Sequence, residues 1–207
     1  MIKIVSKKKI IILGSGGHAK SCIDVINKTN KFIISGIIEK NNKIITDLKI
    51  PILGTDADLI LLRKKFKYAF IAIGQIKSPK IRISKFLQLK KQLFLLPKIV
   101  SPTSYFSKNS YIDEGTIVLH NCVINSGVNV GKNNVINTGT LIEHDVEIGN
   151  YNHISTGVIV NGNVKIGNAN FIGSGAIIYN GIKIGNNCII SSGSIIRNNI
   201  PNNKTFK

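Results

Sequence analysis

The stretch VINSGVNVGKNNVINTGTLIEHDVEIGNYNHISTGVIV (residues 123–160) has an apolar residue at every sixth position, and this period decides the fold of the second half of the chain. The same phase holds at seventeen consecutive positions: Val100, Phe106, Ile112, Val118, Ile124, Val130, Ile136, Ile142, Ile148, Ile154, Val160, Ile166, Ile172, Ile178, Ile184, Ile190 and Ile196. Gly or Asn often follows the apolar residue, where we expect tight corners that need positive φ. Such a repeat is typical of a parallel β-helix, in which three hexads form one triangular coil, so roughly 100 residues predict about five to six coils.

The first half follows a different pattern, in which apolar runs alternate with polar, helix-compatible stretches. We expect strands at residues 9–14, 32–38 and 68–74 and helices at residues 17–29 and 78–91. Strands that alternate with helices predict a small parallel sheet with right-handed crossovers. The predicted fold class is therefore an α/β, Rossmann-like domain with a short parallel sheet over residues 1–98, followed by a parallel β-helix domain over residues 99–207.

The charge of the chain is uneven. Its 207 residues include 28 Lys and Arg against 10 Asp and Glu, a net charge of +18. Residues 1–98 carry 21 basic and 5 acidic side chains, whereas residues 99–207 carry 7 and 5. A basic half favours anionic ligands, although abundant Lys, Asn and Ile are equally typical of AT-rich codon usage. No basic stripe is interleaved with aromatic residues, so nucleic acid is not an expected partner.

Hydropathy and cysteine content bear on the location of the chain and on metal binding. No run of 18 apolar residues predicts a membrane span, and the first twenty residues lack the cleavage pattern of a signal peptide, so we expect a cytoplasmic location. The three cysteines (Cys22, Cys122 and Cys188) are widely spaced and form no ligand motif. We interpret them as reduced packing residues and expect no metal site.

Two histidines lie outside the hexad phase of the repeat. His144 comes two places after Ile142, and His153 follows His144 by half a coil. Both can project outward, and within one chain they should point in different directions. If chains pack side by side as a trimer, His144 of one can face His153 of the next. Gly162 follows His144 by three hexads, so its backbone should lie one coil further along the same face.

Such a group suits acyl transfer. An imidazole can take the proton of a nucleophile near neutral pH, an adjacent acid (Asp145 or Glu143) can hold the other ring nitrogen, and a backbone N–H can stabilise the oxyanion. Histidines that are merely solvated at the surface remain an alternative. His120 shares the phase of His144 but lies four hexads earlier, so we interpret it as a surface residue or a substrate contact at the domain junction and leave it out of the site.

The loop GSGGHA (residues 14–19) lies between a predicted strand and a predicted helix. Its glycines allow close backbone approach, and the following helix N-terminus favours a phosphate group. Glu39 ends the second predicted strand, where a carboxylate can hold a ribose hydroxyl. The short domain fits one nucleotide better than a dinucleotide, and a tight turn without a ligand remains the alternative.

Taken together, IIILGSGGHAK, GIIEK, FIAIG and IEHDVEIGNYNHIS resemble motifs of a bacterial acetyltransferase family, over about residues 8–196. This NeuD/PglD-like family of hexapeptide-repeat acyltransferases includes sialic acid O-acetyltransferases and N-acetyltransferases of nucleotide-linked 4-amino-4,6-dideoxysugars. The resemblance implies a left-handed β-helix, a homotrimer and acetyl-CoA as co-substrate. Relatives commonly end in a VxGxPAK-like segment over the coenzyme, whereas this chain ends in RNNIPNNKTFK.

The resemblance also implies roles for individual residues. His144 would be the general base and Asp145 the acid that raises its basicity. Coenzyme-binding residues would be His153, Gly162, Ser174 and Ser192. The nucleotide part of the sugar substrate would be bound by Gly16, Gly17, His18, Glu39, Lys40 and Gly74.

The leading hypothesis is an acetyl-CoA-dependent N-acetyltransferase that acts on a nucleotide-linked 4-amino-4,6-dideoxysugar in bacterial glycan or surface polysaccharide (lipopolysaccharide) biosynthesis. Direct transfer is expected because no Cys or Ser stands beside His144 as an acyl carrier. O-acetylation of a sialic acid is the nearest alternative. A nicotinamide-dependent oxidoreductase and a non-catalytic β-helix scaffold are alternatives of other classes.

Overall fold

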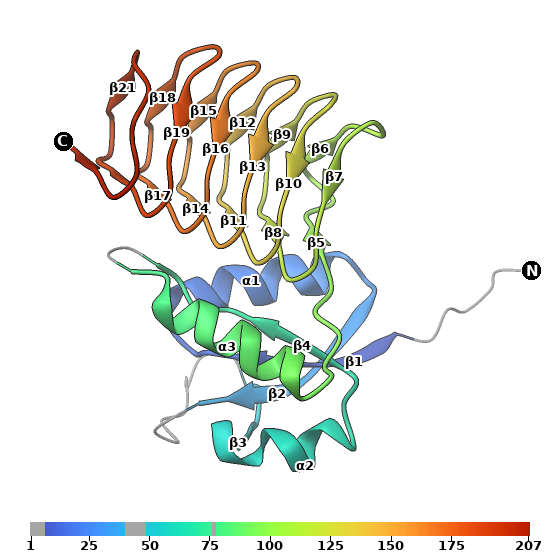
Figure 1. The fold of residues 1–207 in the computed structure, drawn as a ribbon. Helices are drawn as coiled ribbons and strands as arrows, with labels where there is room; N and C mark the ends of the chain where they lie inside the picture. Colours follow the sequence, from blue (N-terminus) through green and yellow to red (C-terminus); the bar gives the residue numbers. More distant parts are fainter. Residues whose placement is uncertain (1–6, 40–48, 76–77) are drawn as a thin grey trace, which may run out of the picture.

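The computed structural model describes residues 7–39, 49–75 and 78–207 (Figure 1). The elements of its first part are β1 (Lys8–Leu13), α1 (Gly17–Lys28), β2 (Phe32–Ile38), β3 (Ile52–Gly54), the 3-10 helix η1 (Asp56–Asp58), α2 (Leu59–Arg63), β4 (Tyr68–Ile71) and α3 (Lys80–Lys91). The four strands form a parallel sheet in the order β3-β2-β1-β4. The expected strands and helices are confirmed, although the third strand ends at Ile71; β3, η1 and α2 were not expected.

The two faces of this sheet pack against different layers. Ile10 and Ile12 of β1 join the apolar cluster of α1, whereas Ile11 and Leu13 point to the opposite face and join the cluster of α2 and α3. The cluster of α1 also contains four residues of the second half, which are Ile99, Ile117, Leu119 and Val135. Helix α1 therefore lies between the sheet and the β-helix (Figure 1).

The second half is a left-handed parallel β-helix built from two-residue strands. Each of its first seventeen strands ends on a residue of the hexad phase: β5 (Ile99–Val100), β6 (Tyr105–Phe106), β7 (Tyr111–Ile112), β8 (Ile117–Val118), β9 (Val123–Ile124), β10 (Asn129–Val130), β11 (Val135–Ile136), β12 (Leu141–Ile142), β13 (Glu147–Ile148), β14 (His153–Ile154), β15 (Ile159–Val160), β16 (Lys165–Ile166), β17 (Phe171–Ile172), β18 (Ile177–Ile178), β19 (Lys183–Ile184), β20 (Ile189–Ile190) and β21 (Ile195–Ile196). Strands three hexads apart pair in parallel, as β11 does with β14. The predicted coil and its apolar core column are thus confirmed.

The coil has three faces, and each is formed by the outward-pointing first residues of its strands. The junction face carries Ile99, Ile117, Val135, His153, Phe171 and Ile189; the apolar face carries Tyr105, Val123, Leu141, Ile159, Ile177 and Ile195; the polar face carries Tyr111, Asn129, Glu147, Lys165 and Lys183. After Ile196 the chain reaches the next paired positions two residues early. Ile200 pairs with Ile184, and β22 (Thr205–Phe206) pairs with β20.

The expected reason for the corner glycines was wrong. Positive φ occurs three places after the core residue, as at Asp145 with φ 59° and Gly157 with φ 67°, and not directly after it. The glycines that directly follow a core residue are required for another reason. A Cβ on Gly149 would lie 2.6 Å from Asn168 Oδ1 and 2.7 Å from the Gly167 carbonyl oxygen of the next coil. These glycines therefore permit close stacking of successive coils.

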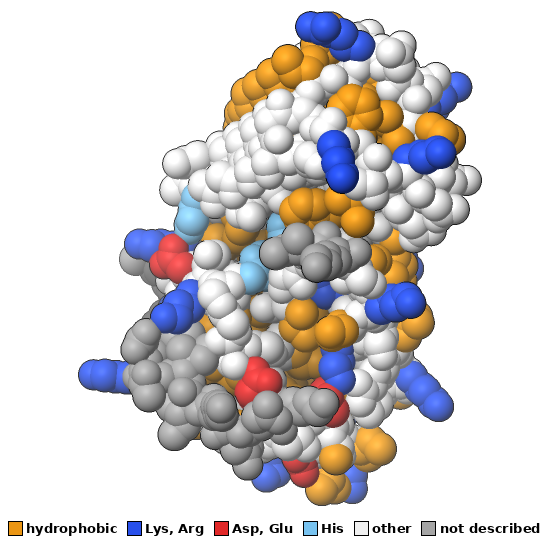
Figure 2. All heavy atoms as spheres, turned by 90° about the vertical axis from the view of Figure 1, so that its left-hand side faces the viewer, with side chains coloured by type: hydrophobic (Ala, Val, Ile, Leu, Met, Phe, Trp, Pro, Cys, Tyr) orange, Lys and Arg blue, Asp and Glu red, His pale blue; other side chains and the backbone are white. Residues whose placement is uncertain are grey.

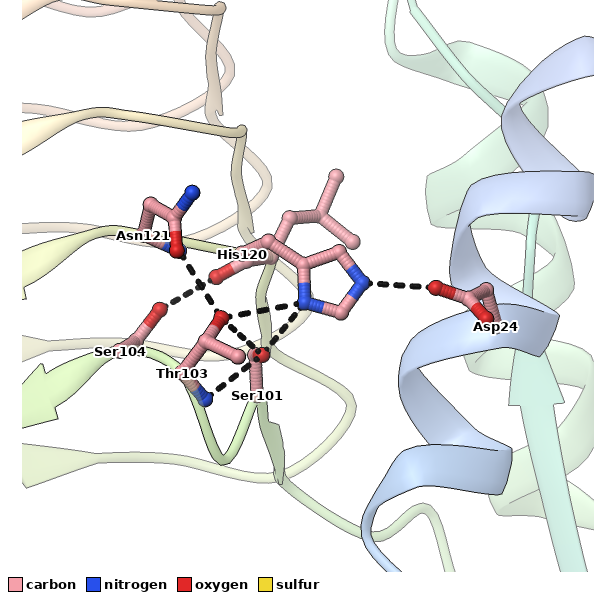
Figure 3. Close-up of polar contacts among 7 residues, drawn as sticks. Asp24, Ser101, Thr103, Ser104, His120 and Asn121 are labelled. Atoms are coloured by element: carbon pink, nitrogen blue, oxygen red, sulfur yellow. Dashed lines mark hydrogen bonds and ion pairs between the residues drawn. The ribbon is translucent and has the colours of Figure 1, made fainter.

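His120 joins the two halves of the chain (Figure 3). Its Nε2 lies 2.8 Å from Asp24 Oδ2 on α1, and its Nδ1 lies 2.7 Å from Ser101 Oγ on the coil. A second ion pair across the junction links Lys90 Nζ on α3 to Glu114 Oε2 at 2.7 Å. His120 thus lies at the domain junction, one of the two places expected for it, and its role as a substrate contact stays a prediction. Among the described residues, no helix is both long enough and apolar enough to cross a membrane.

Candidate active site

His144 and Asp145 lie in the corner between β12 and β13. His144 Nδ1 is 2.9 Å from Asp145 Oδ2, and both side chains are more than half exposed. The positive φ of Asp145 takes this corner out of strict alternation. Glu143, the other acid considered, instead accepts a hydrogen bond from Asn125 Nδ2 at 2.9 Å. Asp145 is therefore the partner that holds the Nδ1–H of the ring, which leaves the lone pair on Nε2.

Gly162 lies directly beneath the His144 ring. A Cβ on Gly162 would stand 2.6 Å from both Cε1 and Nε2 of His144, which is closer than any real carbon contact. A Cβ on Gly127, one coil earlier, would in the same way overlap the carboxylate of Asp145. The expected position of Gly162 on the same face as His144 is confirmed. The observed positions of His144 and Asp145 therefore require glycine at residues 162 and 127.

His153 lies on the junction face and is buried, with 7% of its surface exposed. Its ring centroid is 5.9 Å from that of His18 on α1 and 5.5 Å from that of Phe171 on the coil. The interpretation of His153 as a solvated surface histidine is therefore wrong, because the first domain covers it. Burial, and then the charge of Arg82, lower the pKa of His153 to about 3. Its Nδ1 is buried and has no hydrogen-bond partner among the described residues.

A cavity of about 610 Å³ opens at this junction, and Figure 2 shows histidine side chains at the level where the coil meets the first domain. We call it the junction cavity; it is lined by Gly17, His18, Ser21, Gly74, Gln75, Asn137, Thr138, His153 and Thr156. Gly74 brings the loop after β4 next to His18, since a Cβ there would lie in ordinary contact, 3.4 Å from His18 Cβ. The cavity thus brings predicted substrate residues of the first domain together with His153 of the coil.

Arg82 of α3 lies behind the wall of the junction cavity and is 1% exposed. Its Nη1 donates to Gln75 Oε1 at 3.3 Å, and its Nη2 donates to the Asn133 carbonyl oxygen. Gln75 in turn donates from Nε2 to the Asn170 carbonyl oxygen at 3.4 Å. Burial lowers the pKa of Arg82 to about 10, so the guanidinium remains charged at neutral pH.

Ser174 and Ser192 continue one column of the coil. Thr138, Thr156, Ser174 and Ser192 follow one another at a spacing of one coil, in the corner between the junction face and the apolar face. Backbone hydrogen bonds tie their turns together, with Gly175 N–H donating to the Thr156 carbonyl at 2.9 Å. The two serines are exposed and lead away from the junction cavity. Thr138 and Thr156 were missed, although counting back one coil from Ser174 would have found Thr156.

A second cavity, of about 340 Å³, lies at the carboxyl ends of the parallel strands. It is lined by Leu13, Gly14, Ile38, Glu39, Asp56, Ile73, Ile81 and Lys85. Glu39 accepts a hydrogen bond from the Ser15 hydroxyl, which fixes the carboxylate beside the glycine loop. Gly16 is the N-cap of α1 and supplies no side-chain hydrogen bond to the first N–H groups of the helix, which remain possible donors to an anion. Lys40, also a predicted substrate residue, lies outside the described residues.

A further hollow, a shallow groove of about 970 Å³ on the polar face, is lined by none of the predicted site residues. No group of three or more His, Cys, Asp or Glu within residues 7–39, 49–75 and 78–207 is arranged to hold a metal ion. His144 and Asp145 line neither of the two smaller cavities. Within one chain, the acid–imidazole pair and the junction cavity therefore occupy different corners of the coil.

Comparisons with known proteins match both halves. The PglD N-terminal domain family matches residues 9–86, and the bacterial transferase hexapeptide family (six repeats) matches residues 163–198. A comparison with curated proteins found no match.

Among solved structures, the chain is similar to the acetyltransferase domain of PglB from Neisseria gonorrhoeae in complex with acetyl coenzyme A, with 23% identity, a TM-score of 0.86 and coverage of 97% of this chain and 96% of that one. It is similar to PerB from Caulobacter crescentus in complex with CoA and GDP-perosamine, with 26% identity, a TM-score of 0.87 and coverage of 95% and 92%. It is also similar to WeeI from Acinetobacter baumannii, with 22% identity, a TM-score of 0.81 and coverage of 96% of each chain.

Proposed function

The chain belongs to the PglD-like family of hexapeptide-repeat acyltransferases, and from this premise we propose that it transfers the acetyl group of acetyl-CoA to the amino group of a nucleotide-linked 4-amino-4,6-dideoxysugar. The reaction would serve bacterial glycan or surface polysaccharide biosynthesis in the cytoplasm. The similarity to PerB, whose complex contains CoA and GDP-perosamine, supports both substrate classes.

The junction cavity is the observation that carries the proposal. It joins the glycine loop of the first domain to His153 of the coil, and the cavity beside Glu39 adjoins the same loop. A nucleotide bound between Gly14, Glu39 and the N-terminus of α1 would direct its sugar toward His18 and His153. The column of Ser174 and Ser192 would guide the extended arm of acetyl-CoA into the same place. Both substrates would then meet in the junction cavity, at the end of the column where Thr138 and Thr156 lie.

His144 is proposed as the general base. As the amine nitrogen attacks the thioester carbonyl, the new C–N bond forms and one N–H proton passes to Nε2 of His144. Asp145, at 2.9 Å from Nδ1, stabilises the imidazolium that forms. The C–S bond then breaks, and the departing thiolate of CoA takes the proton from His144. The backbone at Gly162 lies beside the reacting nitrogen of the ring and is a candidate donor to the oxyanion.

A homotrimer would complete this site. His144 lies at the edge of the apolar face that borders the polar face, whereas Thr138 and Thr156 lie at the opposite edge, beside the junction cavity. Three chains that turn their apolar faces toward a threefold axis bring opposite edges of neighbouring chains together at each seam. A rotation about that axis does not shift the chains along it. His144 and Thr138 belong to the same coil, so His144 would face the junction cavity of the next chain at the same height.

The apolar face itself supports this packing. Its outward residues Val123, Leu141, Ile159 and Ile177 are partly exposed, and Ile195 is 45% exposed. A continuous ladder of exposed aliphatic side chains favours burial against another chain. Because opposite edges of the apolar face meet at each seam, a second and a third copy of this chain would close the ring and complete the active site.

The test is thiol release from acetyl-CoA with a panel of acceptors. The panel contains UDP-, dTDP- and GDP-linked 4-amino-4,6-dideoxysugars, CMP-sialic acid and free sialic acid. We expect release with one amino sugar and a loss of at least about 100-fold in kcat for His144→Ala. Lys108→Ala, an exposed position two coils earlier in the same column, is the matched control and should leave kcat unchanged. Release with a sialic acid alone would replace N-acetylation by O-acetylation, and equal activity of both variants would refute His144 as the base.

A further inference from the structure

Within one chain, the described residues that line the junction cavity include no carboxylate for a positively charged ligand. Its polar lining consists of neutral side chains: His18, Ser21, Gln75, Asn137, Thr138, His153 and Thr156. An amino sugar in water near pH 7 is mostly an ammonium ion, because aliphatic amines of this kind have pKa values of about 8. Sites that bind an ammonium ion usually supply an acid or an aromatic face. The described residues of this cavity supply no such acid.

A buried cation lies behind the wall of the cavity. Arg82 is fixed by Gln75 and by the Asn133 carbonyl oxygen, and no carboxylate forms an ion pair with it among the residues that the structure describes. A buried guanidinium without a counter-ion is unfavourable for folding, since its desolvation is not offset by an opposite charge. Because the guanidinium bonds Gln75 of the cavity lining, its charge acts on whatever the cavity binds.

The two imidazoles of the cavity already respond to this environment. Burial, and then the charge of Arg82, lower the pKa of His18 to about 4 and that of His153 to about 3. The same two causes disfavour any other cationic base in the cavity, including an ammonium group. Burial raises the pKa of the Cys22 thiol, which lies 3.3 Å from His18 Nε2, to about 12, so this thiol supplies no negative charge either.

We propose that the junction cavity binds the acceptor amine in its neutral form and that Arg82 excludes the ammonium form. This inference rests on the proposed function. The binding step releases one proton to solvent: enzyme and R–NH3+ give the enzyme·R–NH2 complex and H+. The nitrogen lone pair is then free to attack the thioester, and His144 takes a proton only as the C–N bond forms. His18 from α1 and His153 from β14 line the cavity and face the amine, whereas Cys22 from α1 and Arg82 from α3 lie behind the wall. In the proposed trimer, His144 and its Asp145 from the neighbouring chain would face the amine from the other side.

The experiment is calorimetric titration of the wild-type protein at pH 7 in buffers of different ionisation enthalpy, which counts the protons released on binding. The probes are the UDP-, dTDP- and GDP-linked 4-amino-4,6-dideoxysugars, each compared with its 4-hydroxy counterpart. For the amino sugar that binds, we expect release of roughly 0.9 proton more than for its hydroxy counterpart, the protonated fraction of an amine with a pKa of about 8. Equal proton numbers for the two sugars would overturn the inference, because the amine would then bind as the ammonium ion or hand its proton to His144.

A pair of variants tests the role of Arg82. Arg82→Lys keeps the charge and Arg82→Gln removes it, and thermal melting verifies that each variant is folded. Arg82→Lys should retain the proton release, whereas Arg82→Gln should lose at least half of it. Equal release by the two variants would assign Arg82 a purely structural role. If neither variant folds, the wild-type comparison alone decides whether the neutral amine is bound. Absence of binding by every amino sugar would instead refute the proposed function.

Discussion

Replacement of Gly162 by Ala tests the proposed base through its position rather than its chemistry. The new Cβ would stand 2.6 Å from Cε1 and Nε2 of His144 and 3.0 Å from Asn180 Oδ1. Ordinary carbon contacts require about 3.5–4.0 Å, so the half-exposed ring must move by about 1 Å. A displacement of about 1 Å in a reacting group reduces rates by roughly 100-fold, or about 2.7 kcal/mol of transition-state stabilisation. The backbone of Gly162 is not in the left-handed region, so Ala adds no backbone strain.

The assay is the steady-state kcat for thiol release, with the melting temperature measured in parallel. We expect kcat to fall by about 100-fold and the melting temperature to stay nearly unchanged, because the exposed imidazole can move aside. In a His144→Ala background, the same Gly162→Ala change should have no further effect on kcat, since there is no ring left to displace. A Gly162→Ala variant with wild-type kcat, or one that is equally impaired with and without His144, would refute the reasoning.

Three further predictions concern the acid, the buried imidazoles and the trimer. Asp145→Asn should lower kcat by about 10- to 100-fold with little change in KM, because the amide stabilises the imidazolium less well than a carboxylate does; steady-state kinetics with both substrates would reveal a contrary rise in KM alone. His18 and His153 have folded pKa values of about 4 and about 3 against 6.5 in the unfolded chain, so below pH 6.5 the unfolded chain binds more protons and stability falls as pH falls. Urea unfolding from pH 7 to about pH 4 should show a loss of roughly 1 kcal/mol per pH unit for each imidazole and a shallower slope in His153→Gln, and a flat profile would contradict their burial as neutral groups. Ile159→Glu on the apolar face should dissociate the trimer and abolish activity, whereas Asn129→Glu on the polar face should do neither. Sedimentation velocity measures the oligomeric state, and a monomeric wild-type protein would contradict the trimer.

The β-helix could be predicted from the sequence because its signal is periodic. Seventeen apolar positions in one phase fix the strand ends, the coil length and the core column, and each of these agrees with the structure. β3 and α2 could not be predicted, since such short elements cannot display a period. The reason why glycine is needed directly after a core residue could not be predicted either. A Cβ on Gly149 would overlap Asn168, which belongs to the next coil.

The candidate site was predictable in part. A separation of one whole coil along the sequence is enough to stack His144 on Gly162, and both positions agree with the structure. The surroundings of His153 were not predictable, because the hexad phase gives its direction from the coil and says nothing about the helix that covers it. The burial of Arg82 could not be predicted from the sequence, where it is one of several basic residues in α3. Its burial arises only when α3 meets the coil.

The pairing of strands three hexads apart determines how a deletion would act on this fold. A deletion of three hexads after Gly162 would slide each later residue back by one coil along the same corner, so that Ser192 would take the place of Ser174. A deletion of one hexad would instead turn every later residue by one face and move Ser192 to the corner between the polar and junction faces. Evolutionary changes of length in this part of the gene should therefore be tolerated in steps of whole coils, and single hexads should be gained or lost only beyond the last residue that touches a substrate.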